Sequence, residues 1–149
     1  MKKTYTMLVQ NKPGCLDRIA GITRRYGWNI MSMVAAETPD TKVTRITISL
    51  ECDKFCEWPD EAISKLGFVI SMDVCEDEAY SFHEVLVARG SRKSFGTLLD
   101  SADRISEESE DECTVWWLGE DDYITGLEIK LNNIQEIKAV RSGPMALKR

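Results

Sequence analysis

The sequence predicts an α+β fold of two similar domains in tandem, each a four-stranded antiparallel sheet with two helices on one face. Three observations lead to this prediction. Residues 1–76 alternate between strand-like and helix-like patterns in the order strand, helix, strand, strand, helix, strand. The same order recurs more weakly in residues 77–149, as an internal repeat of about half the chain. The acidic stretch Glu76–Glu78 is the expected linker.

The first strand, loop and helix are expected within residues 4–27. Alternate residues are apolar in 4–10 (TYTMLVQ), a pattern typical of a strand. Residues 11–14 (Asn-Lys-Pro-Gly) have the composition of a turn. After them, apolar and small residues recur with helical spacing at Leu16, Ile19, Ala20 and Thr23. This pattern predicts an amphipathic helix, with Gly27 as its C-terminal cap.

Residues 29–36 are apolar on both faces, which predicts a central strand. Residues 44–51 alternate, with Ile46, Ile48 and Leu50 expected inside and the residues between them outside. Pro59 and the two acidic residues after it favour the start of a helix that ends at Gly67, and 68–74 form the fourth expected strand. Two interleaved right-handed β-α-β units in this order give a ferredoxin-like sandwich.

In the second half, strands are expected at 84–88, 114–118 and 136–140, and helices at 95–102 and 124–134. Trp116 and Trp117 should point to opposite faces of their strand, so that one indole fills the core. The acidic segment 106–112 (SEESEDE) stands where another strand of the repeat would fall. Such a charge run is typical of a solvated loop or a frayed edge strand.

Composition excludes several classes of function. The net charge is −6, and no basic cluster large enough for nucleic acid or an anionic membrane is present. No apolar run approaches the about 18 residues of a membrane span, and the N-terminus lacks a signal-peptide pattern, so a cytoplasmic protein is expected. Five cysteines, an odd number, indicate reduced thiols.

No constellation of catalytic or metal-binding residues is convincing. His83 is the only histidine, and no nucleophile motif accompanies it. Cys52 and Cys56 lack the second pair of ligands of a zinc site, and the acidic run lacks the glycine and final glutamate of a calcium loop. Glycine-rich nucleotide-binding loops are also missing. The chain is therefore expected to be non-catalytic, with no cofactor of its own.

One constellation fits a small ligand: residues 11–14 before a helix, with Asn29 at the start of the next strand. A glycine at a helix N-terminus leaves backbone N–H groups open to a carboxylate. Asparagine side chains can donate to the carboxylate and accept from the ammonium group of an amino acid. The alternative is that 11–14 is only a turn and that Asn29 only begins a strand.

Residues 8–38 (LVQNKPGCLDRIAGITRRYGWNIMSMVAAET) closely resemble the start of acetolactate synthase (acetohydroxyacid synthase) small subunits, which begin with an ACT domain. The family pattern N-x-x-G-x-L-x-R, followed by R-G-Y-N-I-x-S-L, falls on Asn11, Gly14, Leu16, Arg18, Gly21, Arg24, Arg25, Asn29, Ile30 and Ser32. Residues 43–48 resemble its S-R-M-T-I strand, and Arg141–Gly143 its closing A-R-[ST]-G. Three departures are an extra residue at Tyr26, Cys15 in place of a small apolar residue, and the acidic 106–112 in place of an apolar strand.

The resemblance implies an N-terminal ACT domain (1–76) and a C-terminal ACT-like domain (77–149) in a non-catalytic regulatory subunit. It implies a homodimer that binds valine or a related branched-chain amino acid between two ACT domains. Loop 11–15 of one chain and Asn29–Ile30 of the other would form the pocket. The implied ligand-binding residues are Asn11, Lys12, Pro13, Gly14, Cys15, Leu16, Asn29 and Ile30. The implied partner is a catalytic large subunit that carries thiamine diphosphate, FAD and magnesium and becomes subject to feedback inhibition.

Two alternatives remain open from the sequence. The chain could be a free-standing ACT-domain amino-acid sensor or interaction module for another enzyme. A small thiol- or metal-dependent enzyme that uses Cys52, Cys56 and His83 is the more distant alternative.

Overall fold

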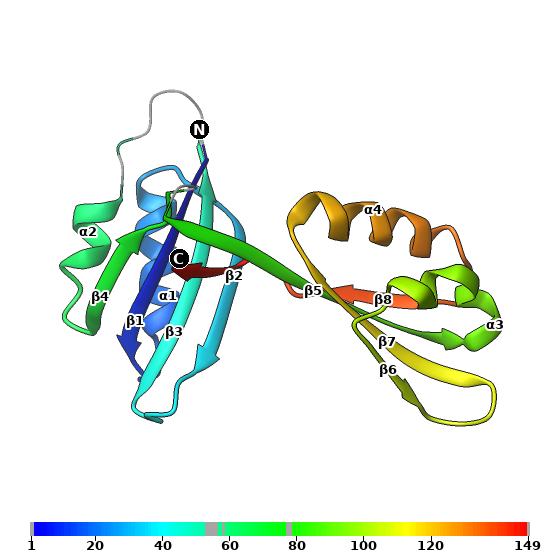
Figure 1. The fold of residues 1–149 in the computed structure, drawn as a ribbon. Helices are drawn as coiled ribbons and strands as arrows, with labels where there is room; N and C mark the ends of the chain where they lie inside the picture. The colour runs from blue at the N-terminus through cyan, green and yellow to red at the C-terminus, as the bar shows by residue number, and fades with distance from the viewer. Residues whose placement is uncertain (1, 53–56, 58, 77–78, 149) are drawn as a thin grey trace. The chain divides into compact units, whose positions relative to one another are not determined.

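The computed structural model describes residues 2–52, 57, 59–76 and 79–148. The chain divides into two compact units (Figure 1). The first contains the residues up to Ser81 together with those from Ala146 onward, and the second contains Phe82–Met145. The domain boundary expected between residues 76 and 77 lies beside residues outside the described part of the chain and stays a prediction.

The first unit is a ferredoxin-like sandwich. Its elements are β1 (Lys2–Gln10), α1 (Cys15–Arg25), β2 (Asn29–Glu37), β3 (Val43–Glu51), α2 (Asp60–Ser64) and β4 (Val69–Val74). The four strands pair antiparallel in the order β2-β3-β1-β4. Ile19 of α1 and Ile63 of α2 are fully buried in one core with Tyr5 and Met7 of β1, so both helices cover the same face of the sheet. The predicted fold class is confirmed for this half of the chain.

The alternation along β1 and β3 explains this core. Met7 lies opposite Ile46, and Tyr5 lies opposite Ile48, all four on the helix-covered face. Burying each aliphatic side chain contributes about 1.5–3 kcal/mol. Thr47 and Ser49 point to the opposite face, as predicted, but they are only 5% and 2% exposed. Side chains this short are covered by their neighbours on the adjacent strands.

The position of β2 differs from the prediction. Its two apolar faces predicted a central strand, but β2 is the end strand of the sheet and pairs only with β3 among the described strands. Met31, at a bulge in the register, is 53% exposed, and Ala35 and Ala36 are also exposed. An apolar edge strand without proline and with one charged residue, Glu37, invites pairing with another chain.

The second unit repeats the sandwich with a modified connection. Its elements are β5 (Tyr80–Ser91), whose first two residues belong to the first unit, α3 (Arg92–Phe95), the 3-10 helix η1 (Gly96–Ser101), β6 (Arg104–Glu107), β7 (Glu112–Gly119), α4 (Asp121–Asn132) and β8 (Lys138–Arg141). The strand order is β6-β7-β5-β8, and a last strand, β9 (Met145–Lys148), also pairs with β5. β9 was not predicted from the sequence.

The helix predicted at 95–102 is only partly present. Gly96 has a positive φ of 52°, which ends the short helix α3, and the chain continues as the 3-10 helix η1. Glycine adopts this backbone conformation without the steric cost that other residues pay. The spacing of Phe95, Leu98, Leu99 and Ala102 still serves packing, because all four contact the second core.

The acidic segment is better ordered than a solvated loop. Ser106 and Glu107 belong to the edge strand β6, and the following residues turn into β7. Arg89 pairs with Glu108 at 2.8 Å and with Glu112 at 3.0 Å, and Arg92 pairs with Glu107 at 2.7 Å. Two arginines from neighbouring segments therefore neutralise part of this charge, which propensity alone does not reveal.

The core of the second unit is formed by α4 and the sheet. Ile124 and Leu131 of α4 are fully buried, as their spacing predicted. Trp117 is also fully buried, with its ring 6.1 Å from that of Phe95. Trp116 points to the other face, where the Arg104 guanidinium lies 5.4 Å from its ring centre. The prediction that one of the two indoles fills the core is confirmed.

Candidate functional site

The loop between β1 and α1 is held firmly in place by the turn that precedes β3. The Asn11 backbone N–H donates to the Lys42 carbonyl at 2.7 Å, and Asn11 Nδ2 donates to the Thr41 carbonyl at 3.1 Å. The Asn11 amide oxygen is therefore left as a free acceptor among the described contacts. Lys12 and Pro13 follow as exposed residues.

The N-terminus of α1 has unsatisfied backbone donors. Gly14 is the N-cap, with φ of 84° and no side-chain cap, and a Cβ built on it would meet nothing within 4 Å. The first i→i−4 hydrogen bond of the helix is donated by the Arg18 N–H to the Gly14 carbonyl at 3.1 Å. Within the described part of the chain, nothing accepts from the N–H groups of Leu16 and Asp17. Open donors at the positive end of a helix dipole bind a carboxylate well.

Cys15 and Leu16 have different surroundings. The Cys15 side chain is buried, and its Sγ donates to the Gln10 carbonyl at 3.3 Å, which fixes the first turn of α1. Leu16 is 43% exposed and offers apolar surface beside the open N–H groups. Of the two, only Leu16 is placed to touch a ligand directly.

Asn29 and Ile30 begin β2, beyond the C-terminal end of α1. Asn29 is exposed, and Ile30 packs partly against the core. Both line a depression of about 470 Å³ together with Ala20, Thr23, Arg24, Gly27 and Trp28. The sequence analysis did not identify Ala20, Thr23 or Arg24 as part of this site. Ala20 and Thr23 share the helical spacing that was assigned to the core, and Arg24 was named only as a position of the family motif.

A single chain does not bring the two groups of residues together. Asn29 lies opposite Glu51, which lies opposite Lys2, whereas Gln10, just before the loop, lies opposite Val43. The nine residues of β1 therefore separate the two groups by about 27 Å. The predicted ligand residues form two half-sites at opposite ends of the sheet.

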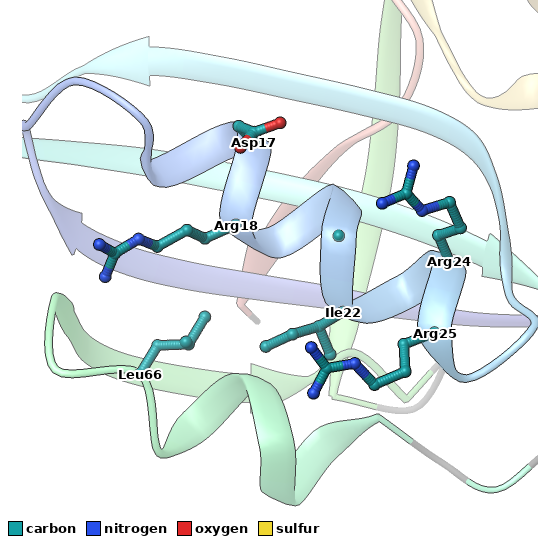
Figure 2. A pocket seen from close by; sticks show the side chains of 7 residues that line it. Asp17, Arg18, Ile22, Arg24, Arg25 and Leu66 are labelled. Carbon is teal, nitrogen blue, oxygen red and sulfur yellow. The ribbon is translucent and has the colours of Figure 1, made fainter.

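A third feature is a basic groove between α1 and α2 (Figure 2). It has a volume of about 440 Å³, with the side chains of Arg18 and Arg25 beside the apolar Ile22 and Leu66. Neither arginine forms an ion pair with any residue that the structure describes. Arg24, also labelled in Figure 2, lines both this groove and the depression that contains Asn29.

The residues weighed for metal or thiol chemistry do not form a centre where they are described. No group of three or more metal-binding side chains occurs among residues 2–52, 57, 59–76 and 79–148. Cys15, Cys75 and Cys113 are free, but Cys52 is disulfide-bonded, so the expectation of reduced thiols was wrong for Cys52. Cys56 lies outside the described residues. None of the described helices is long and apolar enough to cross a membrane.

Comparisons with known proteins agree with the fold and the loop. Residues 6–71 match the family model described as the AHAS small subunit-like ACT domain. A probable acetolactate synthase small subunit from Archaeoglobus fulgidus is 27% identical over 155 residues, covering 100% of this chain and 98% of the relative. The small subunit of acetolactate synthase isozyme 3 from Escherichia coli is 27% identical over 97 residues, covering 64% of this chain and 60% of that protein.

A solved structure shows the same fold. The acetolactate synthase small subunit of Thermotoga maritima superimposes with a TM-score of 0.81 at 21% identity, covering 100% of this chain and 98% of that one. The tandem sandwiches and the open loop before α1 define a two-domain α+β protein with an ACT-like fold. Residues 6–71 match an ACT domain of the acetolactate synthase small subunit type, and the relatives that span almost the whole chain are described as probable small subunits of that enzyme.

Proposed function

We propose that this chain is the regulatory small subunit of an acetolactate synthase, and that two copies form a valine site across paired β2 edges. The proposal depends on one observation, the separation of the predicted ligand residues into two groups at opposite ends of the sheet. One half lies at each end of an open edge strand, so a second copy is needed to complete it. The similarity to small subunits over the full length of the chain supports the choice of enzyme.

The dimer geometry follows from the register. β2 runs from Asn29 to Glu37, and Glu37 lies at the same end of the sheet as the loop 11–14, because its partner Thr44 lies opposite Val9. Antiparallel pairing of two β2 strands about a two-fold axis brings Asn29 of one copy to the Glu37 end of the other. The two half-sites then meet twice per dimer, and the pairing closes the open edge of each sheet.

The chemistry of the joined half-sites fits a small apolar amino acid. The N–H groups of Leu16 and Asp17 would receive the carboxylate, and the free amide oxygens of Asn11 and of the other copy's Asn29 would receive the ammonium. Charge-assisted hydrogen bonds of this kind contribute about 1.5–3 kcal/mol each. Leu16 and Ile30 would surround the isopropyl group, whose burial adds about 1.5–3 kcal/mol and separates valine from alanine.

Regulation requires that the ligand favour one arrangement of the subunits. A ligand that contacts both copies can do so, and a coupling of about 1–3 kcal/mol gives a 5- to 150-fold effect on the partner. The reaction itself, with thiamine diphosphate, FAD and magnesium, belongs to the catalytic large subunit. This chain contributes binding energy and geometry, with no cofactor of its own.

The first prediction concerns this role. The purified chain should form no acetolactate from pyruvate, because the sequence offers no nucleophile, base and cofactor loop together. Mixed with the catalytic subunit from the same organism, it should raise the rate of acetolactate formation several-fold and make that rate fall when valine is added. A steady-state assay with and without valine measures both effects. If the rate does not change and no complex forms, the free-standing amino-acid sensor replaces this proposal.

A further inference from the structure

The face of the N-terminal sheet opposite α1 and α2 is mainly polar and includes short side chains such as Thr6 and Ser71. Leu8 of β1 lies opposite Arg45 of β3 on one side and Ser71 of β4 on the other, and Thr6 lies opposite Asp73 of β4. These five side chains share this outer face, because alternate residues of each strand point away from the helices. Short side chains leave open space above the sheet.

A cavity of about 260 Å³ lies on this outer face. The five residues above line it together with residues at the start of β5 and in β9, among them Tyr80 and Leu147. All of its lining residues belong to the first unit. The cavity is separate from both half-sites of the proposed valine site, which lie along α1 and at the ends of β2.

Two opposite charges line this cavity without pairing. The Arg45 side chain forms no hydrogen bond or ion pair with any described residue. The buried Tyr80 hydroxyl donates to Asp73 Oδ2 at 3.1 Å, which orients the carboxylate and leaves Oδ1 free. Burial, and then the hydrogen bond to Asp73, raise the pKa of Tyr80, so its hydroxyl stays protonated and remains a donor. A cation and an oriented carboxylate that stay more than 4 Å apart leave room for a ligand with both charges.

We propose that this cavity is a second small-ligand site, which takes the zwitterion of a free α-amino acid. The Arg45 guanidinium receives the ligand carboxylate in a bidentate hydrogen bond, with the Lys148 ammonium as a second cation at the rim. Asp73 Oδ1 accepts from the ligand ammonium. The Thr6 and Ser71 hydroxyls complete the polar contacts, and Leu8 and Leu147 offer apolar surface to a small side chain.

The ligand would touch two segments that lead toward the second unit along the chain. Tyr80 is the first residue of β5, and Leu147 belongs to β9, which pairs with β5. Ser81 Oγ donates to the Leu147 carbonyl at 3.3 Å, so these segments are already joined beside the cavity. Binding would order them further, which gives the site a physical route to influence the rest of the chain.

The experiment is a nuclear magnetic resonance titration of the full chain that carries Gly14→Asp. This substitution disables the proposed valine site, so that the remaining changes report on the cavity alone. L-valine is the probe, and the amide signals of Leu8, Ser71 and Leu147 are the readout. We expect these three signals to shift with saturation. Arg45→Gln and Asp73→Asn should each weaken the binding by about tenfold or more, since each removes a charged partner. Arg18→Gln, on the helix-covered side, is the matched control and should change nothing.

Two analogues separate a zwitterion site from a simple ion site. Isovalerate lacks the amino group of valine, and isobutylamine lacks its carboxylate, so each should bind about tenfold or more weakly than valine. Equal binding of isovalerate would mean that the cavity is only an anion site. The proposal is also overturned if valine leaves the three amides unmoved, or if both cavity variants bind as the Gly14→Asp parent does. The signals of Leu16 and Asp17 in the wild-type chain report separately on the proposed valine site.

Discussion

Gly14 is the residue on which the proposed valine site depends most. Its positive φ and the empty space beside its Cα keep the N–H groups of Leu16 and Asp17 accessible. Gly14→Asp would place a negative charge where the ligand carboxylate binds, so we expect valine binding to weaken by about 100-fold or more, as two charge-assisted bonds are lost. Isothermal titration calorimetry with valine measures the change.

Gly14→Asn is the control for that variant, because asparagine has nearly the same size and tolerates a positive φ as aspartate does. Its loss of valine affinity should be about tenfold or less, and the difference between the two variants is the effect of the charge. Both variants should retain the thermal stability of the wild type to within about 1–2 kcal/mol, the cost of this backbone conformation. If Gly14→Asp binds valine as tightly as the wild type, the pocket lies elsewhere.

Arg141 is the second residue with a testable role, in this case in stability. It pairs through Nε with Glu84, whose side chain is 5% exposed, and through its other nitrogens with Asp121 at 2.5 Å and Glu128 at 3.3 Å. The hydrogen bond to Glu84 is the main reason that the pKa of Arg141 is raised, against the opposing effect of burial. The arginine therefore remains charged at physiological pH.

Arg141→Met should destabilise the chain by about 3–5 kcal/mol, because it leaves the buried Glu84 carboxylate without a partner. Adding Glu84→Gln to that variant should restore part of the lost stability, since the glutamine amide leaves no unpaired buried charge. Urea unfolding followed by tryptophan fluorescence gives the free energies of unfolding. A loss below about 1 kcal/mol for Arg141→Met would mean that the ion pair is no stronger than an exposed one.

At the scale of whole elements, the strands and helices with a regular pattern could be predicted and those shaped by context could not. β1, α1 and α4 follow from the spacing of their apolar residues alone. The helix expected at 95–102 was shortened by the backbone of Gly96, which sequence spacing does not encode. β9 has only four residues and depends on pairing with β5, so local pattern gives it no signal.

The strand β2 was predicted correctly as a strand, but its position in the sheet was predicted wrongly. Its apolar faces were correctly interpreted as a strand, but they indicated a central one, whereas β2 is at the edge. A strand that pairs with a second copy is central in the dimer and an edge in the single chain. The sequence pattern and the fold agree if the dimer is the functional form.

Changing this edge should separate the copies. Ala35→Lys places a long charged side chain on the exposed part of β2, next to the strand that would pair with it, and lysine is a typical blocker of edge pairing. We expect the variant to sediment as a monomer and to lose valine binding. Ile70→Lys, on the opposite edge strand β4, is the matched control, since Ile70 is 53% exposed and lies away from the proposed interface. A dimer that survives Ala35→Lys and dissociates with Ile70→Lys would move the interface to β4.

At the scale of the whole molecule, the residues of the proposed valine site could be predicted from the sequence, but their separation within one chain could not. The motif resemblance indicated Asn11, Gly14 and Asn29, and the register then showed that one chain holds them at opposite ends of its sheet. Ala20 and Thr23, which line the depression beside Asn29, could not be recognised from the sequence, because their helical spacing is shared with the core positions of α1. The outer-face pair of Arg45 and Asp73 had no local signal, since strands distant in the sequence bring them to one cavity.

The central claim, a valine site shared between two copies, is tested most directly by mixing two defective chains. Gly14→Asp disables the half-site in the loop. Asn29→Arg disables the other half-site, because arginine is larger and its positive charge repels the ligand ammonium. Each variant alone should bind no valine at this site. After unfolding and refolding together, each mixed dimer contains one site with Gly14 from one chain and Asn29 from the other, both intact. Calorimetry should then show wild-type affinity at about one site per mixed dimer. A mixture that binds no more valine than the two variants do separately would contradict the account.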